Sequence, residues 1–358
     1  MMNNIEDIYS LSPSQSGLLF HSVYEPDSRV YYQQFTLGLH GDLDIVAFRN
    51  AWKALVQRHS VMRTAFLWEE LDDAYQVVQT EVALPLCEQD WRGKPELEAA
   101  LQQLELAERA EPLELNQAPL MRLCLVQTAH QQWHFIWTFH HIMMDGWSVG
   151  VAMQEWFELY ESCRLAKSAS LPQARPYKDF IAWQAEQDLA TTEAFWREQL
   201  SNVSEPTPLP DFAVASARIT DIKLPYAEQQ TLFSQEETKV LQDFVRTERL
   251  TLNTLFQGAW ALLLGHHSSR AEVMFGVTVA GRPDSLAASD SMVGLFINTL
   301  PLQVEWTANP TLNDWLRNLQ ERNSEMRQHA WLPLAKLKPF SQVPADRPLF
   351  DSILVFEN

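Results

Sequence analysis

The chain has 358 residues, of which 46% are hydrophobic. This length exceeds the size at which a single hydrophobic core stops growing, so we expect two lobes of about 150 to 200 residues each. Asp and Glu outnumber Lys and Arg by 46 to 27, and the resulting net charge of −19 argues against binding to nucleic acids or anionic membranes.

The sequence carries no segment typical of export or of a membrane span. Its start lacks the basic and apolar regions of a signal peptide, and apolar stretches such as 259–264 are too short to cross a bilayer. Cys87, Cys124 and Cys163 are widely spaced and lack the paired spacing of zinc ligands, which indicates free buried thiols. We expect a soluble cytoplasmic protein without a metal site.

Strands and helices alternate through the first half of the chain. Residues of alternating hydrophobicity predict strands, and apolar residues that recur at helical spacing predict helices. Asp42 is the expected N-cap of the first of these helices, which ends near Arg58. The expected elements are strands over 31–39, 62–68, 75–79, 121–127 and 133–139, and helices that begin near Asp42, Pro95 and Ser148.

The segment 168–176 contains two prolines among small polar residues and is the predicted linker between the lobes. The expected division is an N-terminal lobe over 1–167 and a C-terminal lobe over 177–358. Because the chain stops inside a strand pattern, we expect the C-terminal lobe to be truncated. The elements expected in this lobe are helices over 177–187, 192–200 and 251–264 and strands over 273–279, 295–306 and 350–356.

The strongest candidate for a functional site is the strand end at His140 and His141, which Asp145 and Gly146 follow closely. An imidazole transfers protons near neutral pH, and a carboxylate orients a ring or holds the backbone. Neighbouring side chains on a strand point to opposite faces, so only one histidine can face a substrate and the other is structural. For the same reason, convergence of the two rings with Asp145 on one metal ion is disfavoured.

Residues 146–150 also match G-x-S-x-G, the nucleophile turn of α/β-hydrolases, with Ser148 as the nucleophile. In that fold an acid and then a histidine follow the serine, and here the later histidines are His266, His267 and His329, in uninformative contexts. We therefore favour Ser148 as the N-cap of the following helix.

Two polar residues stand out elsewhere in the sequence. Arg63 lies at a helix-to-strand joint and is a candidate buried partner for Asp145, with a surface ion pair as the alternative. Asn298 lies in an otherwise apolar strand, where an amide needs hydrogen bonds, so it either holds the backbone or faces a cleft.

Taken together and in order, these segments resemble the condensation domains of nonribosomal peptide synthetases. The family's H-H-x-x-x-D-G motif matches His140, His141, Asp145 and Gly146. Six ordered matches make coincidence an unsatisfactory explanation. The other matching segments are 11–21, 58–66, 177–183, 281–283, 292–301 and 349–358.

The resemblance implies an α/β (α+β) fold of two chloramphenicol-acetyltransferase-like lobes. These would form a V-shaped pseudo-dimer with the active-site tunnel between them. It implies a peptide-bond-forming acyltransferase of antibiotic or siderophore biosynthesis, monomeric and without a cofactor of its own. Upstream and downstream carrier proteins would bring the substrates on phosphopantetheine arms, and an adenylation domain would adjoin the chain.

The same resemblance implies roles for individual residues. His141 is the main catalytic group, either as a general base or as a group that positions the amine and stabilises the oxyanion, and Gly146 leaves room for the thioester. Alternatives within the superfamily are an epimerisation-type or a noncatalytic recruiting domain, and the serine hydrolase is a remote one. The expected supporting residues are His140, Asp145, Arg63 and Ser148, and the expected cleft or tunnel residues are Asn298, Trp147 and Arg282.

Overall fold

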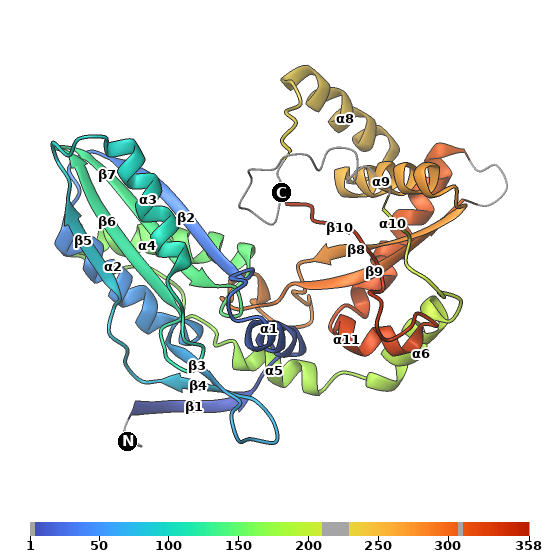
Figure 1. Ribbon diagram of the computed structural model, residues 1–358, viewed down its shortest axis with the longest axis horizontal. Helices are drawn as coiled ribbons and strands as arrows, with labels where there is room; N and C mark the ends of the chain where they lie inside the picture. The colour runs from blue at the N-terminus through green and yellow to red at the C-terminus, as the bar shows by residue number, and fades with distance from the viewer. Residues whose placement is uncertain (1–3, 210–228, 307–310, 358) are drawn as a thin grey trace. The chain divides into compact units, whose positions relative to one another are not determined.

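The computed structural model describes residues 4–209, 229–306 and 311–357. Contacts divide the chain into two compact units, each of mixed helices and strands (Figure 1). The first unit comprises 1–187 together with 282–297, and the second comprises 188–281 and 298–358.

This division differs from the one expected from the sequence. The predicted linker, 168–176, forms no helix or strand, but it lies inside the first unit. The chain passes to the second unit only after Gln187, and the segment 282–297 returns to the first. This return brings residues from the second half of the sequence to the histidine motif.

The first unit contains two sheets. The larger has the order β2-β7-β6-β5, with β5 parallel to β6 and the other pairs antiparallel, and the smaller is antiparallel with the order β1-β4-β3. The strands are β1 (Ile5–Ser10), β2 (Tyr32–His40), β3 (Thr64–Leu67), β4 (Tyr75–Gln79), β5 (Leu86–Asp90), β6 (Met121–Ala129) and β7 (Gln132–His140).

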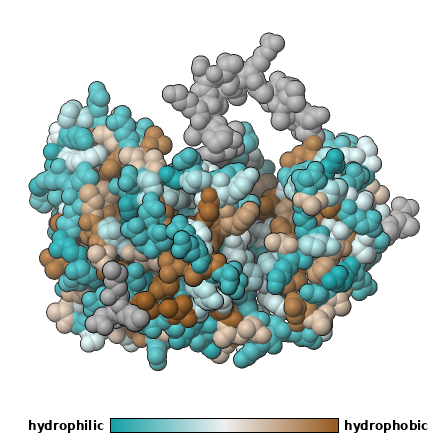
Figure 2. Space-filling model, turned by 60° about the horizontal axis from the view of Figure 1, so that its bottom comes forward, coloured by the Kyte–Doolittle hydropathy of each residue, from teal (hydrophilic) through white to brown (hydrophobic). Residues whose placement is uncertain are grey.

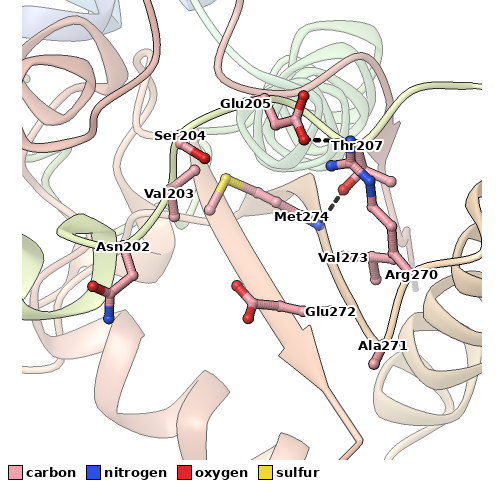
Figure 3. A pocket seen from close by; sticks show the side chains of 10 residues that line it. All are labelled: Asn202, Val203, Ser204, Glu205, Thr207, Arg270, Ala271, Glu272, Val273 and Met274. Carbon is pink, nitrogen blue, oxygen red and sulfur yellow. Dashed lines mark hydrogen bonds and ion pairs between the residues drawn. The ribbon is translucent and has the colours of Figure 1, made fainter.

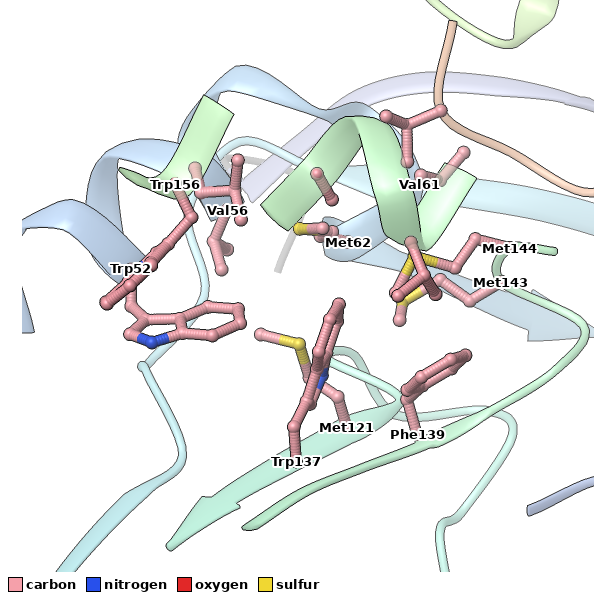
Figure 4. Close-up of a cluster of buried hydrophobic side chains, with 14 of the residues drawn as sticks. Trp52, Val56, Val61, Met62, Met121, Trp137, Phe139, Met143, Met144 and Trp156 are labelled. Atoms are coloured by element: carbon pink, nitrogen blue, oxygen red, sulfur yellow. The ribbon is translucent and has the colours of Figure 1, made fainter. Parts of the chain in front are cut away.

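Helices cover both faces of the larger sheet. Trp137 of β7 packs with Trp52 and Trp156 in the main core (Figure 4). Ile136 faces a smaller cluster that includes Leu104. A strand buried on both faces can be apolar at successive positions, as β6 is over 123–126. The helices of this unit are α1 (Pro13–Tyr24), α2 (Ile45–Arg58), α3 (Leu97–Ala110), α4 (Gly146–Arg164) and α5 (Lys178–Ala185), with 3-10 turns at Ser60–Arg63 and Ser289–Ser291.

The second unit is built on a sheet of order β10-β8-β9, in which β8 pairs antiparallel with β9 and parallel with β10. Its core joins Phe275 of β8 to Trp196 of α6 and Leu316 of α10. The elements are α6 (Leu189–Leu200), α8 (Gln235–Glu248), α9 (Leu252–Ser268), β8 (Glu272–Val279), β9 (Asn298–Glu305), α10 (Leu312–Gln328), α11 (Leu334–Leu337), a 3-10 turn at Lys338–Phe340 and β10 (Ile353–Leu354).

Most of the predicted elements lie within a few residues of their expected positions, but two predicted caps are wrong. The side chain of Asp44, not Asp42, accepts a hydrogen bond from Ala47 N–H at the start of α2. Asp145, not Ser148, caps α4. Among the described residues, β1, α1, β5, α8, α10 and α11 were not predicted as elements. The two strands and α11 are short, α8 and α10 are strongly polar, and the apolar residues of α1 are largely consecutive and not spaced at helical intervals.

No helix in the described ranges is long and apolar enough to cross a membrane. The face in Figure 2 is largely hydrophilic, with hydrophobic residues in scattered groups between the polar ones.

Candidate active site

The histidine motif lies where β7 ends. His140 is the last residue of the strand, and a turn over 141–144 leads to Asp145 and α4. The backbone N–H of His141 donates to Tyr31 O at 2.8 Å, and that of Met143 donates to His140 O at 3.1 Å. The two histidines therefore have fixed backbones but different surroundings.

His140 is buried and its ring has a defined tautomer. Nδ1 accepts a hydrogen bond from Ile142 N–H at 3.1 Å, so Nε2 carries the proton and donates to Ser22 Oγ at 3.1 Å. Burial, and then the neighbouring His141, lower the pKa of His140 to about 3. The ring stays neutral at physiological pH, and both of its nitrogens are engaged within the protein.

His141 is only partly buried, and one of its nitrogens is available. Nδ1 lies 2.8 Å from the carbonyl oxygen of Met144, so Nδ1 carries the proton and Nε2 bears the lone pair. Nε2 has no hydrogen-bond partner among the described residues. This nitrogen can accept a hydrogen bond or a proton from a substrate.

Asp145 is fully buried and ties α4 to the returning segment 282–297. One carboxylate oxygen accepts from Ser148 N–H at 2.9 Å and so caps the helix. The other accepts from the backbone N–H groups of Phe296 and Ile297, at 2.9 and 3.2 Å. A buried carboxylate needs such donors, because an unpaired one is costly in a low-dielectric interior.

The expected pairing of Asp145 with Arg63 is wrong. Arg63 forms an ion pair with Glu6 at 2.7 Å, and its Nε donates to Val56 O at 3.2 Å. Asp145 instead pairs with Arg282, whose Nη2 lies 3.3 Å from the carboxylate. Arg63 lies at the end of the 3-10 turn, where its N–H groups donate to backbone carbonyls and to Glu6. Arg282 reaches Asp145 because the segment 282–297 returns to the first unit.

Arg282 is therefore a buried ion-pair partner. Its side chain is only 2% exposed, and burial lowers its pKa. It also donates to Ser148 Oγ at 2.8 Å and to Met292 O at 2.9 Å, and its guanidinium carbon lies 4.0 Å from the centre of the Phe296 ring.

Ser148 is fully buried, and its hydroxyl group is engaged on both sides. The hydroxyl donates to Gly294 O at 2.7 Å and accepts from Gly294 N–H at 3.0 Å and from Arg282. Ser148 lies inside α4, with Asp145 as the cap, so its expected role as N-cap is wrong. A buried hydroxyl with three such partners is unsuited to nucleophilic attack, which disfavours the hydrolase.

The remaining residues that were expected at the site or in its cleft have different surroundings. Gly146 is exposed at the start of α4, and a Cβ added there meets no atom within 4 Å. Trp147 is half exposed, and its indole N–H donates to Asp290 O at 2.9 Å. Asn298 belongs to the second unit, where its amide donates to the carbonyls of Ala330 and Leu332 at 2.7 and 2.8 Å.

Three residues that hold the motif in place were not predicted to do so from the sequence. Gln15 donates to Ile142 O at 3.2 Å, directly after His141, and its capping box with Ser12 was a readable signal. Tyr177 is buried and donates to Leu295 O at 2.5 Å. A Cβ on Gly294 would lie 2.1 Å from the Tyr177 ring, a contact that sequence spacing does not reveal.

Each unit contains a cavity. One of about 250 Å³ in the first unit is lined by Ser22, Tyr31, Trp68 and His140, among others. Another, of about 330 Å³, lies in the second unit beside β8, where Thr207 Oγ1 accepts from Met274 N–H at 2.8 Å (Figure 3). No group of three or more potential metal ligands occurs in the described part of the chain.

A strand-end histidine with a free ring nitrogen, followed by a helix locked by a buried carboxylate, is a site suited to acyl or proton transfer. A family model described as "Condensation domain" matches residues 5–358. The chain therefore belongs to the condensation-domain family.

Relatives in sequence are large synthetase subunits. The chain is 41% identical over 357 residues to one subunit of the linear gramicidin synthase of Brevibacillus parabrevis, covering 99% of this chain and 5% of that protein. It is also 41% identical to another subunit of the same synthase, covering 100% of the chain and 7% of that subunit. The chain thus spans a small part of these relatives.

Solved structures show the same fold. The starter condensation domain of rhizomide synthetase RzmA matches with a TM-score of 0.78 and 21% identity over 97% of this chain and 78% of that one. The first condensation domain of the calcium-dependent antibiotic synthetase matches with a TM-score of 0.73 and 18% identity over 94% and 78%. The expected mixed α/β condensation-domain fold is confirmed.

The family match and the synthetase relatives also confirm the expected class of activity. The chain is a condensation domain of nonribosomal peptide synthesis, a peptide-bond-forming acyltransferase.

Proposed function

We propose that the chain joins a donor aminoacyl or peptidyl thioester to the amine of an acceptor aminoacyl thioester. In this proposal, an upstream and a downstream carrier protein deliver the two substrates on phosphopantetheine arms, and an adenylation domain adjoins the chain. The small share of each synthetase subunit that the chain spans supports a role as one part of a multidomain enzyme.

The observation that carries the proposal is the fixed orientation of the His141 ring. The Met144 carbonyl holds the proton on Nδ1, so Nε2 presents a lone pair to the acceptor amine. The amine nitrogen attacks the thioester carbonyl carbon, a C–N bond forms, and the C–S bond breaks. The proton lost by the amine ends on the departing sulfur, and the donor arm leaves as a thiol.

The reaction needs few catalytic groups from the protein. A thioester is already activated and an α-amino group titrates near pH 8, so positioning supplies much of the rate acceleration. His141 acts either by removing the proton or by holding the amine and stabilising the oxyanion. Gly146 adds room, because its exposed position at the start of α4 has no neighbouring atom where a side chain would begin.

The test mixes the chain with two loaded carrier proteins and monitors amide formation by intact-protein mass spectrometry. We expect His141→Ala to reduce the rate at least about 100-fold, the usual contribution of a general base or a positioned group. His141→Gln separates the two roles, because its side-chain oxygen accepts a hydrogen bond but not a proton. His130→Ala, in the exposed turn before β7, is the matched control. Full activity of His141→Ala would contradict the proposal.

A further inference from the structure

Cys87 and Cys124 lie side by side in the larger sheet of the first unit. β5 runs parallel to β6, and these two cysteines pair in register. In-register neighbours on adjacent strands point to the same face, and the strands lie about 4.8 Å apart. This spacing falls within the Cα separation of about 4.4 to 6.8 Å that a disulfide requires.

A shared neighbour indicates that the two sulfurs converge. Gln89 lies two residues after Cys87 and so points to the same face of β5. Its Nε2 lies 3.3 Å from Cys87 Sγ and 4.0 Å from Cys124 Sγ. One amide group therefore contacts both thiols.

The two thiols differ in exposure. Cys87 lies on the edge strand and is exposed, contrary to the expectation that all three cysteines are buried. Cys124 is buried in the cluster with Val126 and Ile136 that α3 covers. Burial, followed by the nearby Cys87, raises the pKa of the Cys124 thiol to about 12. A reagent in solution therefore meets Cys87 first.

We propose that Cys87 and Cys124 form a redox-active dithiol that reacts with low-molecular-weight disulfides and closes to a cross-strand disulfide. The Cys87 thiolate attacks one sulfur of the reagent, whose S–S bond breaks, and one reagent thiolate leaves. The Cys124 thiolate then attacks the Cys87 sulfur of this mixed disulfide, and the second reagent thiolate leaves. The cysteines lose two electrons and two protons, and the reagent is reduced to two thiols.

The experiment exposes the full chain to excess oxidised glutathione. Samples are quenched with acid and alkylated, then studied by intact mass and peptide mapping without reduction. We expect a glutathione adduct on Cys87 first, and then a protein lighter by two hydrogens with Cys87 linked to Cys124. The second step is expected to accelerate as the pH rises, because Cys124 must lose its proton before it attacks.

Two variants provide the controls. Cys124→Ala should stop at the adduct on Cys87, and Cys163→Ala should react like the wild type, because Cys163 lies on α4. A stable adduct in the wild type with Cys124 still alkylated after unfolding would overturn the proposal, as would an unreactive Cys87. The wild-type peptide map decides the question even if Cys124→Ala fails to fold.

Discussion

Arg282 donates a hydrogen bond to Asp145 across 137 positions of the sequence, and both side chains are buried within the first unit. The guanidinium also reaches Ser148, and Asp145 also holds the backbone of Phe296. The start of α4 is thereby fixed to the returning segment 282–297, immediately after the turn that orients His141.

We expect Arg282→Ala to destabilise the protein by about 3 to 5 kcal/mol, because the carboxylate of Asp145 is left buried without its charged partner. The urea midpoint measures this effect. Arg92 offers a matched control, since it pairs with Asp90 at the exposed surface. Arg92→Ala should leave the midpoint nearly unchanged, and equal effects of the two substitutions would refute a special role for the buried pair.

Gly294 should tolerate no side chain. The Cβ of an alanine would overlap the Tyr177 ring, so we expect Gly294→Ala to cost about 1 to 3 kcal/mol through forced repacking. Gly150 lies inside α4 with no atom within 4 Å of an added Cβ. Gly150→Ala should therefore stabilise the protein by up to about 1 kcal/mol. The thermal unfolding temperatures of both variants test these two predictions. An unchanged unfolding temperature for Gly294→Ala would contradict the first, because it would show that Tyr177 moves aside without cost.

Stability should fall as the pH drops below 6.5, and His140 should cause part of this fall. Its pKa is about 3 in the folded protein against an ordinary 6.5, so the unfolded chain binds more protons between these values. The expected loss from this group is about 1 kcal/mol between pH 6.5 and 5.5. His140→Asn keeps an acceptor for Ile142 N–H but cannot be protonated, so its pH profile should be flatter.

Glu155 and His329 also have lowered pKa values, so their effects on the pH dependence of stability must be separated from that of His140. Burial raises the pKa of Glu155, but hydrogen bonds from His59 and Arg58 outweigh it and lower the pKa to about 2. Its contribution to stability is present above about 4.5 and is lost as the pH falls toward 2, below the window used for His140. His329, whose pKa is lowered by burial, remains in both proteins and cancels in the comparison. Identical profiles for wild type and His140→Asn between pH 5 and 6.5 would disprove the assignment.

A substitution at Gly146 should reduce activity without reducing stability. An added side chain meets no protein atom at Cβ, so Gly146→Leu should unfold at nearly the wild-type temperature. If this space admits the reacting thioester, amide formation should fall at least about 10-fold, because a misplaced substrate loses its productive orientation. Gly17→Leu, on α1 where an added Cβ also meets no atom within 4 Å, is the control for the same added bulk. Undiminished condensation by Gly146→Leu would remove Gly146 from the site.

Much of the fold could be predicted from the sequence because local patterns encode local structure. The alternation in 133–139 correctly indicates β7, since a strand's side chains alternate between two faces that helices cover. The H-H-x-x-x-D-G motif indicated the candidate site for the same reason, as its residues lie within one strand end and one helix start. The short strand β5 and the polar helix α10 carried too weak a pattern to be recognised.

The tertiary structure alone decided which distant groups meet. The sequence pointed to Arg63 as the partner of Asp145, and only the return of 282–297 to the first unit brings Arg282 to the carboxylate instead. The engagement of the Ser148 hydroxyl likewise depends on Gly294, which lies 146 positions away in the sequence. Sequence patterns report periodicity along the chain, whereas ion pairs and buried hydrogen bonds depend on distances across it.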